Sequence, residues 1–321
     1  MKKIGVLILV VWANFIVHAQ QQQHYTQFMH NKLALNAGYA GSNEVACLSA
    51  IYRKQWIGLD GAPETQVLSF NTPLLNQKIG IGLSLVHNKI GITDTWTGDL
   101  AYAYRIRVSS NGWLGLGVNA SFRNFTQNFA DERLHATQPL NTDGSIPIGN
   151  QNKYVGNVGA GLYYNSPYVY AGVSVPRLIR NNIDFSDATL KVGTEVVHGY
   201  AMLGAIIPVS SSFKISPQGL LKVSENAPLD AEINTTLIFA NKLFIGGSYR
   251  FGGSTKVGFG ESVDIMLGVQ IGEHLYLGGA YDITLSELKD YSSGSLEVLL
   301  RYCFGKRATT QPDEYINPRF F

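Results

Sequence analysis

Residue types that can carry chemistry are spread along this sequence without forming a catalytic motif. HExxH, GxSxG and GxxxxGK followed by Ser or Thr are absent, and no GxGxxG stands between a predicted strand and a predicted helix. His87, His198 and His274 fall near predicted strand ends, without the spacing of metal ligands. We expect these histidines to lie at the rim of the fold, and we predict no enzyme activity, no metal and no cofactor.

Charged side chains on the predicted strands form the other group that can act chemically. Alternation puts carboxylates and bases on the face opposite the apolar residues, where paired or hydrated charges are a simpler explanation than a catalytic dyad. The carboxylates are Asp99, Glu232, Asp264, Asp282 and Glu297, and the bases are Arg53, Arg105, Arg107, Arg123, Lys214, Lys222, Arg250 and Arg301.

The two cysteines fall at the two ends of the predicted sheet. Cys47 lies near the start of the first predicted strand, and Cys303 lies near the end of the last. If the sheet closes into a barrel, these strands become neighbours, and alternation turns both side chains toward the lumen. An oxidising compartment permits a disulfide there. A bond across the seam and two unpaired small residues are the alternatives that the sequence leaves open.

The elements that position these residues are strands with a strict two-residue period. In the segment from Gly112 to Phe125, Leu114, Leu116 and Val118 alternate with Gly, Asn and Ser. Charged residues make up only 15% of the chain, whereas there are 34 Gly and 17 Tyr. Apolar residues facing outward around a polar lumen are typical of an outer-membrane barrel, whereas a soluble β-sandwich has a polar outer face. The net charge of +2 gives no reason to expect nucleic acid.

The lengths of the connections favour the barrel over the sandwich. We predict an all-β transmembrane antiparallel barrel of about fourteen strands, each near the ~10 residues that a tilted membrane strand needs. Long connections such as Gln55–Glu64 and His87–Asp94 alternate with short turns such as Leu75–Gln77. This alternation predicts long extracellular loops and periplasmic turns, with both termini in the periplasm. The strands begin near Val45, Thr65, Lys78, Thr95, Gly112, Lys153, Tyr168, Val197, Phe213, Leu229, Lys242, Ser262, His274 and Gly294.

The start of the chain predicts export. Lys2 and Lys3 precede an apolar run and a small residue, Ala19, after which we expect cleavage of a signal peptide. We expect the segment after the cleavage point to pack into the barrel mouth as a plug, with a trailing periplasmic segment as the alternative. The predicted parts are a signal peptide at 1–19, an N-terminal segment at 20–44, the barrel at 45–304 and a periplasmic tail at 305–321.

Three stretches give the sequence a resemblance to a known family. "YTQFMHNKLALNAGYAG" (Tyr25–Gly41), "YRKQWIGLDGAPETQ" (Tyr52–Gln66) and "GIGLSLVHNKIG" (Gly80–Gly91) resemble the PorP/SprF outer-membrane proteins of the Bacteroidetes type IX secretion and gliding system. The resemblance covers essentially the mature chain. It implies a barrel whose partners are other secretion components and secreted proteins with a type B C-terminal signal domain, which it helps to export or to hold at the cell surface.

The motif residues fall into two sets. Tyr25, Phe28, Asn31, Asn36 and Tyr39 are expected to belong to the plug. Arg53, Trp56 and Glu64 are the candidates for partner contact, because aromatic residues and Arg are favoured interface anchors. A general diffusion pore and a lipid-modifying barrel enzyme are the two alternative functions.

Overall fold

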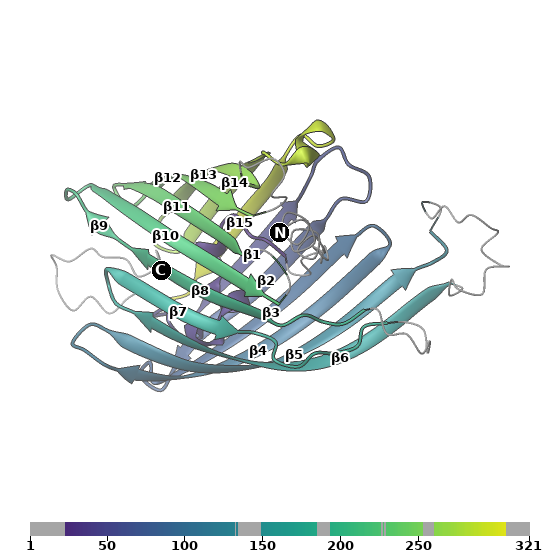
Figure 1. Cartoon of the computed structure of the whole chain (residues 1–321). Helices are drawn as coiled ribbons and strands as arrows, with labels where there is room; N and C mark the ends of the chain where they lie inside the picture. Colours follow the sequence, from purple (N-terminus) through teal and green to yellow (C-terminus); the bar gives the residue numbers. More distant parts are fainter. Residues whose placement is uncertain are drawn as a thin grey trace, which may run out of the picture.

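A computed structural model of the chain describes residues 23–131, 133, 149–184, 193–225, 227, 229–252 and 260–305. The predicted signal peptide at 1–19 and all but the first residue of the predicted tail at 305–321 lie outside the described residues. One antiparallel sheet closes into a fourteen-strand barrel, because β15 pairs with β1 and β10 pairs with β11 (Figure 1). The predicted strand starts lie within three residues of the observed ones.

Every strand except one is a single uninterrupted segment. The exception is β8, which resumes after Ile206 as the two-residue β9, and both pieces pair with β10. The strands are β1 (Cys47–Lys54), β2 (Glu64–Leu74), β3 (Ile79–Ile90), β4 (Thr93–Arg107), β5 (Trp113–Asn128), β6 (Asn150–Asn165), β7 (Val169–Val175), β8 (His198–Ala205), β9 (Ile207–Pro208), β10 (Phe213–Ser224), β11 (Asp230–Phe239), β12 (Leu243–Phe251), β13 (Ser262–Ile271), β14 (Leu275–Thr284) and β15 (Ser295–Cys303).

The strands turn apolar side chains outward and polar side chains inward, as the alternation predicts. Leu68, Leu85 and Val118 are exposed on the outer face. Of the charged residues predicted to face the lumen, most are buried or half-buried inside. Arg107 is the exception, because it lies at the last position of β4, where its guanidinium donates to the carbonyls of Ser109 and Ser110. An apolar exterior around a polar interior is the arrangement that a lipid bilayer requires of a barrel.

The two ends of the barrel differ in their connections. The long-loop end carries the described residues of the connections 55–63, 129–149, 176–197, 225–229, 252–261 and 285–294. The short-turn end carries 75–78, 108–112, 166–168, 209–212, 240–242 and 272–274. The predicted long loop at His87–Asp94 is wrong: β3 and β4 continue to a tight turn at Gly91, whose φ of +54° suits glycine, and the His87 ring bonds to Asp94 across the strands.

The N-terminal segment lies inside the barrel. Residues 23–43, called the plug from here on, run through the lumen in short turns: η1 (Phe28–His30), α2 (Lys32–Leu35) and η2 (Ala37–Tyr39) (Figure 1). They begin beside the long-loop halves of β11, β14 and β15, and they reach β1 at the short-turn end. Nearly every plug side chain is buried. No helix within the described ranges combines the length and apolar character needed to cross a membrane.

Glycines on the inner face of the wall make room for the plug. The Ala40 carbonyl lies where a side chain of Gly80 would be, since an added Cβ there would meet it at 2.0 Å. An added Cβ at Gly117 would meet Ala37 and Gly38 in the same way, with 2.1 Å to the nearest atom. The polar face of these strands is therefore rich in glycine because the plug backbone packs directly on the strand backbone.

Candidate functional site

The plug begins at a junction with two buried carboxylates of the wall. The backbone N–H groups of Thr26 and Gln27 each donate to Glu297, at 2.9 Å. The Thr26 hydroxyl donates to Asp282 at 2.7 Å, and it accepts from Arg53 at 2.7 Å. Three strands, β1, β14 and β15, thus hold the first turn of the plug through side-chain hydrogen bonds that are closed off from solvent.

Arg53 is the cation at the centre of this junction. Its guanidinium lies 2.6 Å from the Asp282 carboxylate and 3.2 Å from the Glu297 carboxylate. Only 1% of its surface is exposed. The sequence suggested Arg53 as a contact for a partner, and this placement instead favours an internal role, in which Arg53 joins the plug to the wall.

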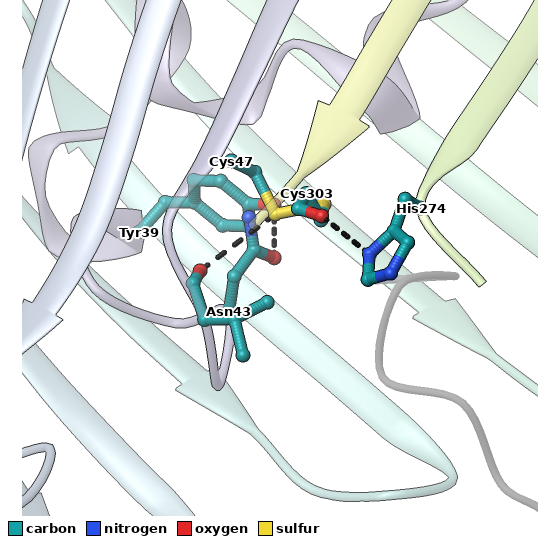
Figure 2. Close-up of a disulfide and its surroundings, with 6 residues drawn as sticks. Tyr39, Asn43, Cys47, His274 and Cys303 are labelled. Atoms are coloured by element: carbon teal, nitrogen blue, oxygen red, sulfur yellow. Dashed lines mark hydrogen bonds between the residues drawn. A yellow bond between two sulfur atoms is a disulfide. The ribbon is translucent and has the colours of Figure 1, made fainter. Parts of the chain in front are cut away.

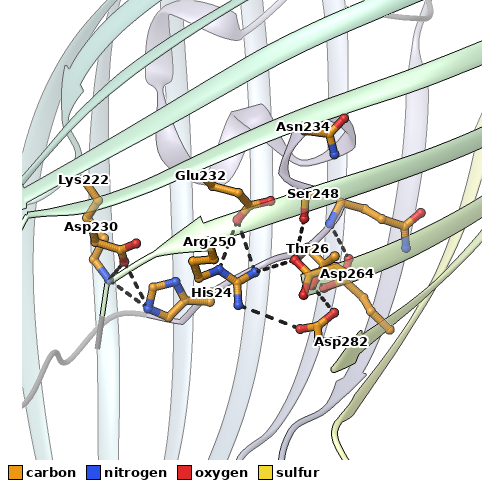
Figure 3. A network of polar contacts seen from close by, with 12 residues as sticks. His24, Thr26, Lys222, Asp230, Glu232, Asn234, Ser248, Arg250, Asp264 and Asp282 are labelled. Atoms are coloured by element: carbon orange, nitrogen blue, oxygen red, sulfur yellow. Dashed lines mark hydrogen bonds and ion pairs between the residues drawn. The ribbon is translucent and has the colours of Figure 1, made fainter. Parts of the chain in front are cut away.

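A second arginine extends the network across the inner wall (Figure 3). Arg250 lies 3.2 Å from Glu232, 3.7 Å from Asp264 and 3.8 Å from Asp282. All four side chains are buried. Removing Arg250 would leave buried carboxylates without their cation, which is costly.

Two described residues of the loop between β7 and β8 pair with charged side chains on the inner face of the opposite wall. Glu195 from this loop pairs with Arg123 of β5, and its other oxygen accepts from Asn157 of β6 at 3.0 Å. Arg177 from the same loop lies 3.7 Å from Asp99 and 3.7 Å from Glu195. Sequence reasoning missed Arg177 and Glu195, because they lie outside the strands and show no period.

Small cavities remain where the described residues of the plug pack against the wall. Three cavities lie against the plug, of about 20, 10 and 10 Å³. A cavity of this size holds about one water molecule. Where the plug packs on the wall, side chains of the described residues therefore occupy most of the space between them.

The middle of the plug carries a buried lysine. The Lys32 ammonium donates to the Met29 carbonyl at 2.8 Å and lies 4.3 Å from the centre of the Tyr170 ring. A second ring, that of Tyr39, lies 5.7 Å away. Burial, with a further contribution from Arg301, lowers the pKa of Lys32 well below its ordinary value.

The five motif residues expected in the plug are all buried inside the barrel: Tyr25, Phe28, Asn31, Asn36 and Tyr39. Asn36 shows how they contact the wall. Its amide donates to the carbonyls of Leu162 and Val173, at 2.9 and 3.3 Å, while its oxygen accepts from Gly38 at 2.8 Å. The side chain thus bridges β6, β7 and the next turn of the plug.

Trp56 and Glu64 belong to the long-loop end. Trp56 is half-buried with a φ of +47°. Its backbone N–H donates to the Ser295 hydroxyl at 3.2 Å. The next residue, Ile57, bonds through its backbone to Ser293 and Gly294 of the β14–β15 loop. The two loops are therefore held together as one surface. Glu64 is half-buried at the start of β2, and it lies opposite Lys54 and Lys89 on the neighbouring strands.

The two cysteines meet at the seam of the barrel. Cys47 and Cys303 are register partners on β1 and β15, with Cα atoms 4.0 Å apart, and they form a disulfide (Figure 2). The carbonyl of Cys303 also lies 2.9 Å from the His274 ring. The disulfide closes the seam at the short-turn end, beside the point where the plug passes into β1.

The plug also brings a histidine to the wall that the sequence did not suggest. The His24 ring lies 3.4 Å from Asp230 on β11 and 3.4 Å from the Lys222 ammonium on β10. Burial and then the charges of Lys222, Arg250 and Arg53 lower the pKa of His24 well below its ordinary value. This contact could not be predicted from the sequence, because the plug has no periodic pattern that would show where it runs.

A family comparison covers both the plug and the wall. The model of the family described as "Type IX secretion system membrane protein PorP/SprF" matches residues 17–302. The chain belongs to this PorP/SprF family. The match therefore extends from the end of the predicted signal peptide, through the plug, to the last strand of the barrel. This PorP/SprF protein is an outer-membrane barrel associated with type IX secretion.

Solved structures similar to this PorP/SprF barrel are outer-membrane proteins. The crystal structure of Acinetobacter baumannii Omp33 is 10% identical, with 81% of this chain and 98% of that chain covered and a TM-score of 0.47. A FadL homologue of Pseudomonas aeruginosa is 12% identical over 81% of this chain and 89% of that chain, with a TM-score of 0.42. The CymD monoaromatic hydrocarbon channel is 9% identical over 82% and 87%, with a TM-score of 0.48. No curated protein matches the chain.

Proposed function

We propose that this PorP/SprF protein is a non-enzymatic docking barrel. Its partner is a secreted protein with a type B C-terminal signal domain, which it helps to export or to anchor at the cell surface beside other secretion components. The long-loop end faces the outside of the cell, because longer loops of outer-membrane barrels are extracellular. Family membership supports the secretion context.

The burial of the plug inside the barrel is the observation that carries this proposal. The cavities of about 20, 10 and 10 Å³ against the plug each hold about one water molecule, which supports a plug that is packed against the wall. A barrel with such an interior acts through its surface. The joined loops at residues 55–63 and 285–294 form the part of that surface that includes Trp56, and Glu64 lies at its edge.

A general diffusion pore is the second candidate, and the burial of the plug inside the barrel counts against it. A lipid-modifying enzyme would need a converging nucleophile and base that face lipid or solvent. The charged groups that do converge in the described residues, such as Arg53 and Glu297, are enclosed between the plug and the wall. We therefore keep docking as the proposed activity.

Affinity purification from the native envelope in mild detergent tests the docking proposal. We expect a protein with a type B signal domain to co-purify with the wild-type barrel. Trp56→Ala and Glu64→Gln should lower its recovery several-fold, since a central aromatic contact is worth about 2 kcal/mol or more. Matched controls are Trp96→Ala, on the outer wall, and Glu273→Gln, in a short turn. Recovery of the barrel alone would count against docking. An equal loss of the co-purifying protein in the control variants would show that Trp56 and Glu64 do not form the docking site.

A further inference from the structure

Three side chains that can bind a metal converge where the plug enters the long-loop half of the lumen. They are His24 of the plug, Asp230 at the start of β11 and Glu261 just before β13. Their nearest ligand atoms all lie within 4.8 Å of one another, and the His24 ring is 3.4 Å from Asp230. Ligand atoms around a bound Zn²⁺ lie roughly 3–4 Å apart, given metal–ligand bonds of about 2.0–2.2 Å. A small rotation of side chains would bring the three groups to that spacing.

The surroundings of these residues carry an excess of negative charge. Among the described residues, six carboxylates belong to this cluster and its neighbours along the inner wall, and three cations face them, so the carboxylates outnumber the cations by three. Buried charge without compensation is costly, so protons or a bound cation must neutralise it. The carboxylates are Asp230, Glu232, Glu261, Asp264, Asp282 and Glu297, and the cations are Arg53, Lys222 and Arg250.

An unsatisfied acceptor lines the same place. Glu232 is 4% exposed, and its Oε1 has no hydrogen-bond partner among the described residues, while Oε2 accepts from Arg250. This carboxylate lines the cavity of about 20 Å³ together with His24 and Asp230. Such a cavity accommodates one water molecule or one ion. The unpaired oxygen and the cavity are independent of the spacing of the three side chains, and they favour a cation beside His24 and Asp230.

We propose that His24, Asp230 and Glu261 bind a divalent transition-metal cation of the Zn²⁺ type, which fastens the start of the plug to the barrel wall. One imidazole and two carboxylates suit such a cation, whereas Ca²⁺ and Mg²⁺ prefer oxygen ligands alone. The site lies at the long-loop end, so it fills from outside the barrel. Its role is separate from docking: it decides how firmly the plug is held.

Lys222 competes with the metal for this site. Its ammonium lies 3.4 Å from the His24 ring and 3.9 Å from the Asp230 carboxylate. The ammonium thus fills the cation's place when no metal is bound, and its flexible stem lets it move away when a metal binds. The alternative is that Lys222 is the permanent partner of these groups. The two readings predict opposite results when Lys222 is replaced.

Metal titration of the full mature barrel in detergent, after treatment with a chelator, tests the site with Zn²⁺ alone as the probe. We expect one Zn²⁺ per chain by calorimetry. His24→Ala and Glu261→Gln should each weaken binding at least tenfold, Lys222→Met should strengthen it, and His274→Ala at the short-turn end should leave it unchanged. Absence of Zn²⁺ binding, or equal affinity in His24→Ala, would overturn the proposal. Lower affinity in Lys222→Met would identify Lys222 as a supporting group and contradict the competition.

Hydrogen exchange separates a fastening role from simple binding. Zn²⁺ should slow exchange of the Thr26 and Gln27 amides in the wild type, because these amides, two and three residues after His24, donate to Glu297. The same metal should have no effect on these amides in His24→Ala. A folded His24→Ala barrel is recognised by unchanged heat-modifiable migration on gels, so loss of the effect cannot be confused with misfolding. Zn²⁺ that binds without protecting the two amides would overturn the fastening role.

Discussion

Arg53 connects the plug to two neighbouring strands of the wall. It contacts Thr26 of the plug, Asp282 of β14 and Glu297 of β15. The period of β1 predicts that Arg53 faces inward, and this is the part of its role that the sequence contains. Its partners could not be predicted, because Asp282 and Glu297 lie more than two hundred residues away and Thr26 lies in a segment without a period.

Replacing Arg53 by Ala should destabilise the barrel strongly. Asp282 and Glu297 would lose their shared cation, and breaking a buried pair in this way costs about 3–5 kcal/mol. Urea unfolding of the purified barrel, followed by tryptophan fluorescence, measures the change in free energy. Arg107→Ala is the matched control, since Arg107 is exposed at the short-turn end. Equal shifts for both variants would contradict the role assigned to Arg53.

The plug is the element that makes this barrel different from an open one. It packs closely because its backbone lies directly against strand backbone at glycine positions. Its sequence is rich in aromatic residues and Leu, which predicts that it packs somewhere. Its path was not predictable, because it is made of turns of three or four residues that contact strands all around the barrel. One available signal was the glycine on the inner faces of strands, such as Gly80 and Gly117, where backbone meets backbone.

Gly80→Ala should loosen the plug without preventing closure of the barrel. The added Cβ would lie 2.0 Å from the Ala40 carbonyl oxygen, which is a severe clash with backbone. The plug backbone near Ala40 must therefore shift to relieve it. We expect faster hydrogen exchange in residues 37–41 and little change in the strands. Gly279→Ala is the control, because a Cβ added at Gly279 meets nothing within 4 Å. Unchanged exchange in Gly80→Ala would show that the plug does not pack there.

At the scale of the whole molecule, the barrel was predictable and its interior was not. Alternation and turn spacing are local properties, so strand number, strand starts and the inward face follow from the sequence. The ion pairs inside the lumen depend on how the strands are staggered and on which loop residues point inward. The contact of Arg123 with Glu195 is an example, since a loop carries the carboxylate to the strand. Such contacts are set by the closed shape and leave no local pattern.

The closed interior makes a prediction about the whole molecule that separates a sealed barrel from a pore. The purified barrel, inserted into a planar lipid bilayer, should give no stable conductance steps, because the plug is packed against the wall inside the barrel. A variant that lacks residues 23–40 should give steps, since the wall is closed by its own strand pairing and the space of the plug would fill with water. Arg107→Ala serves as a sealed control. Steady conductance from the wild type would contradict the sealed state and favour the diffusion pore.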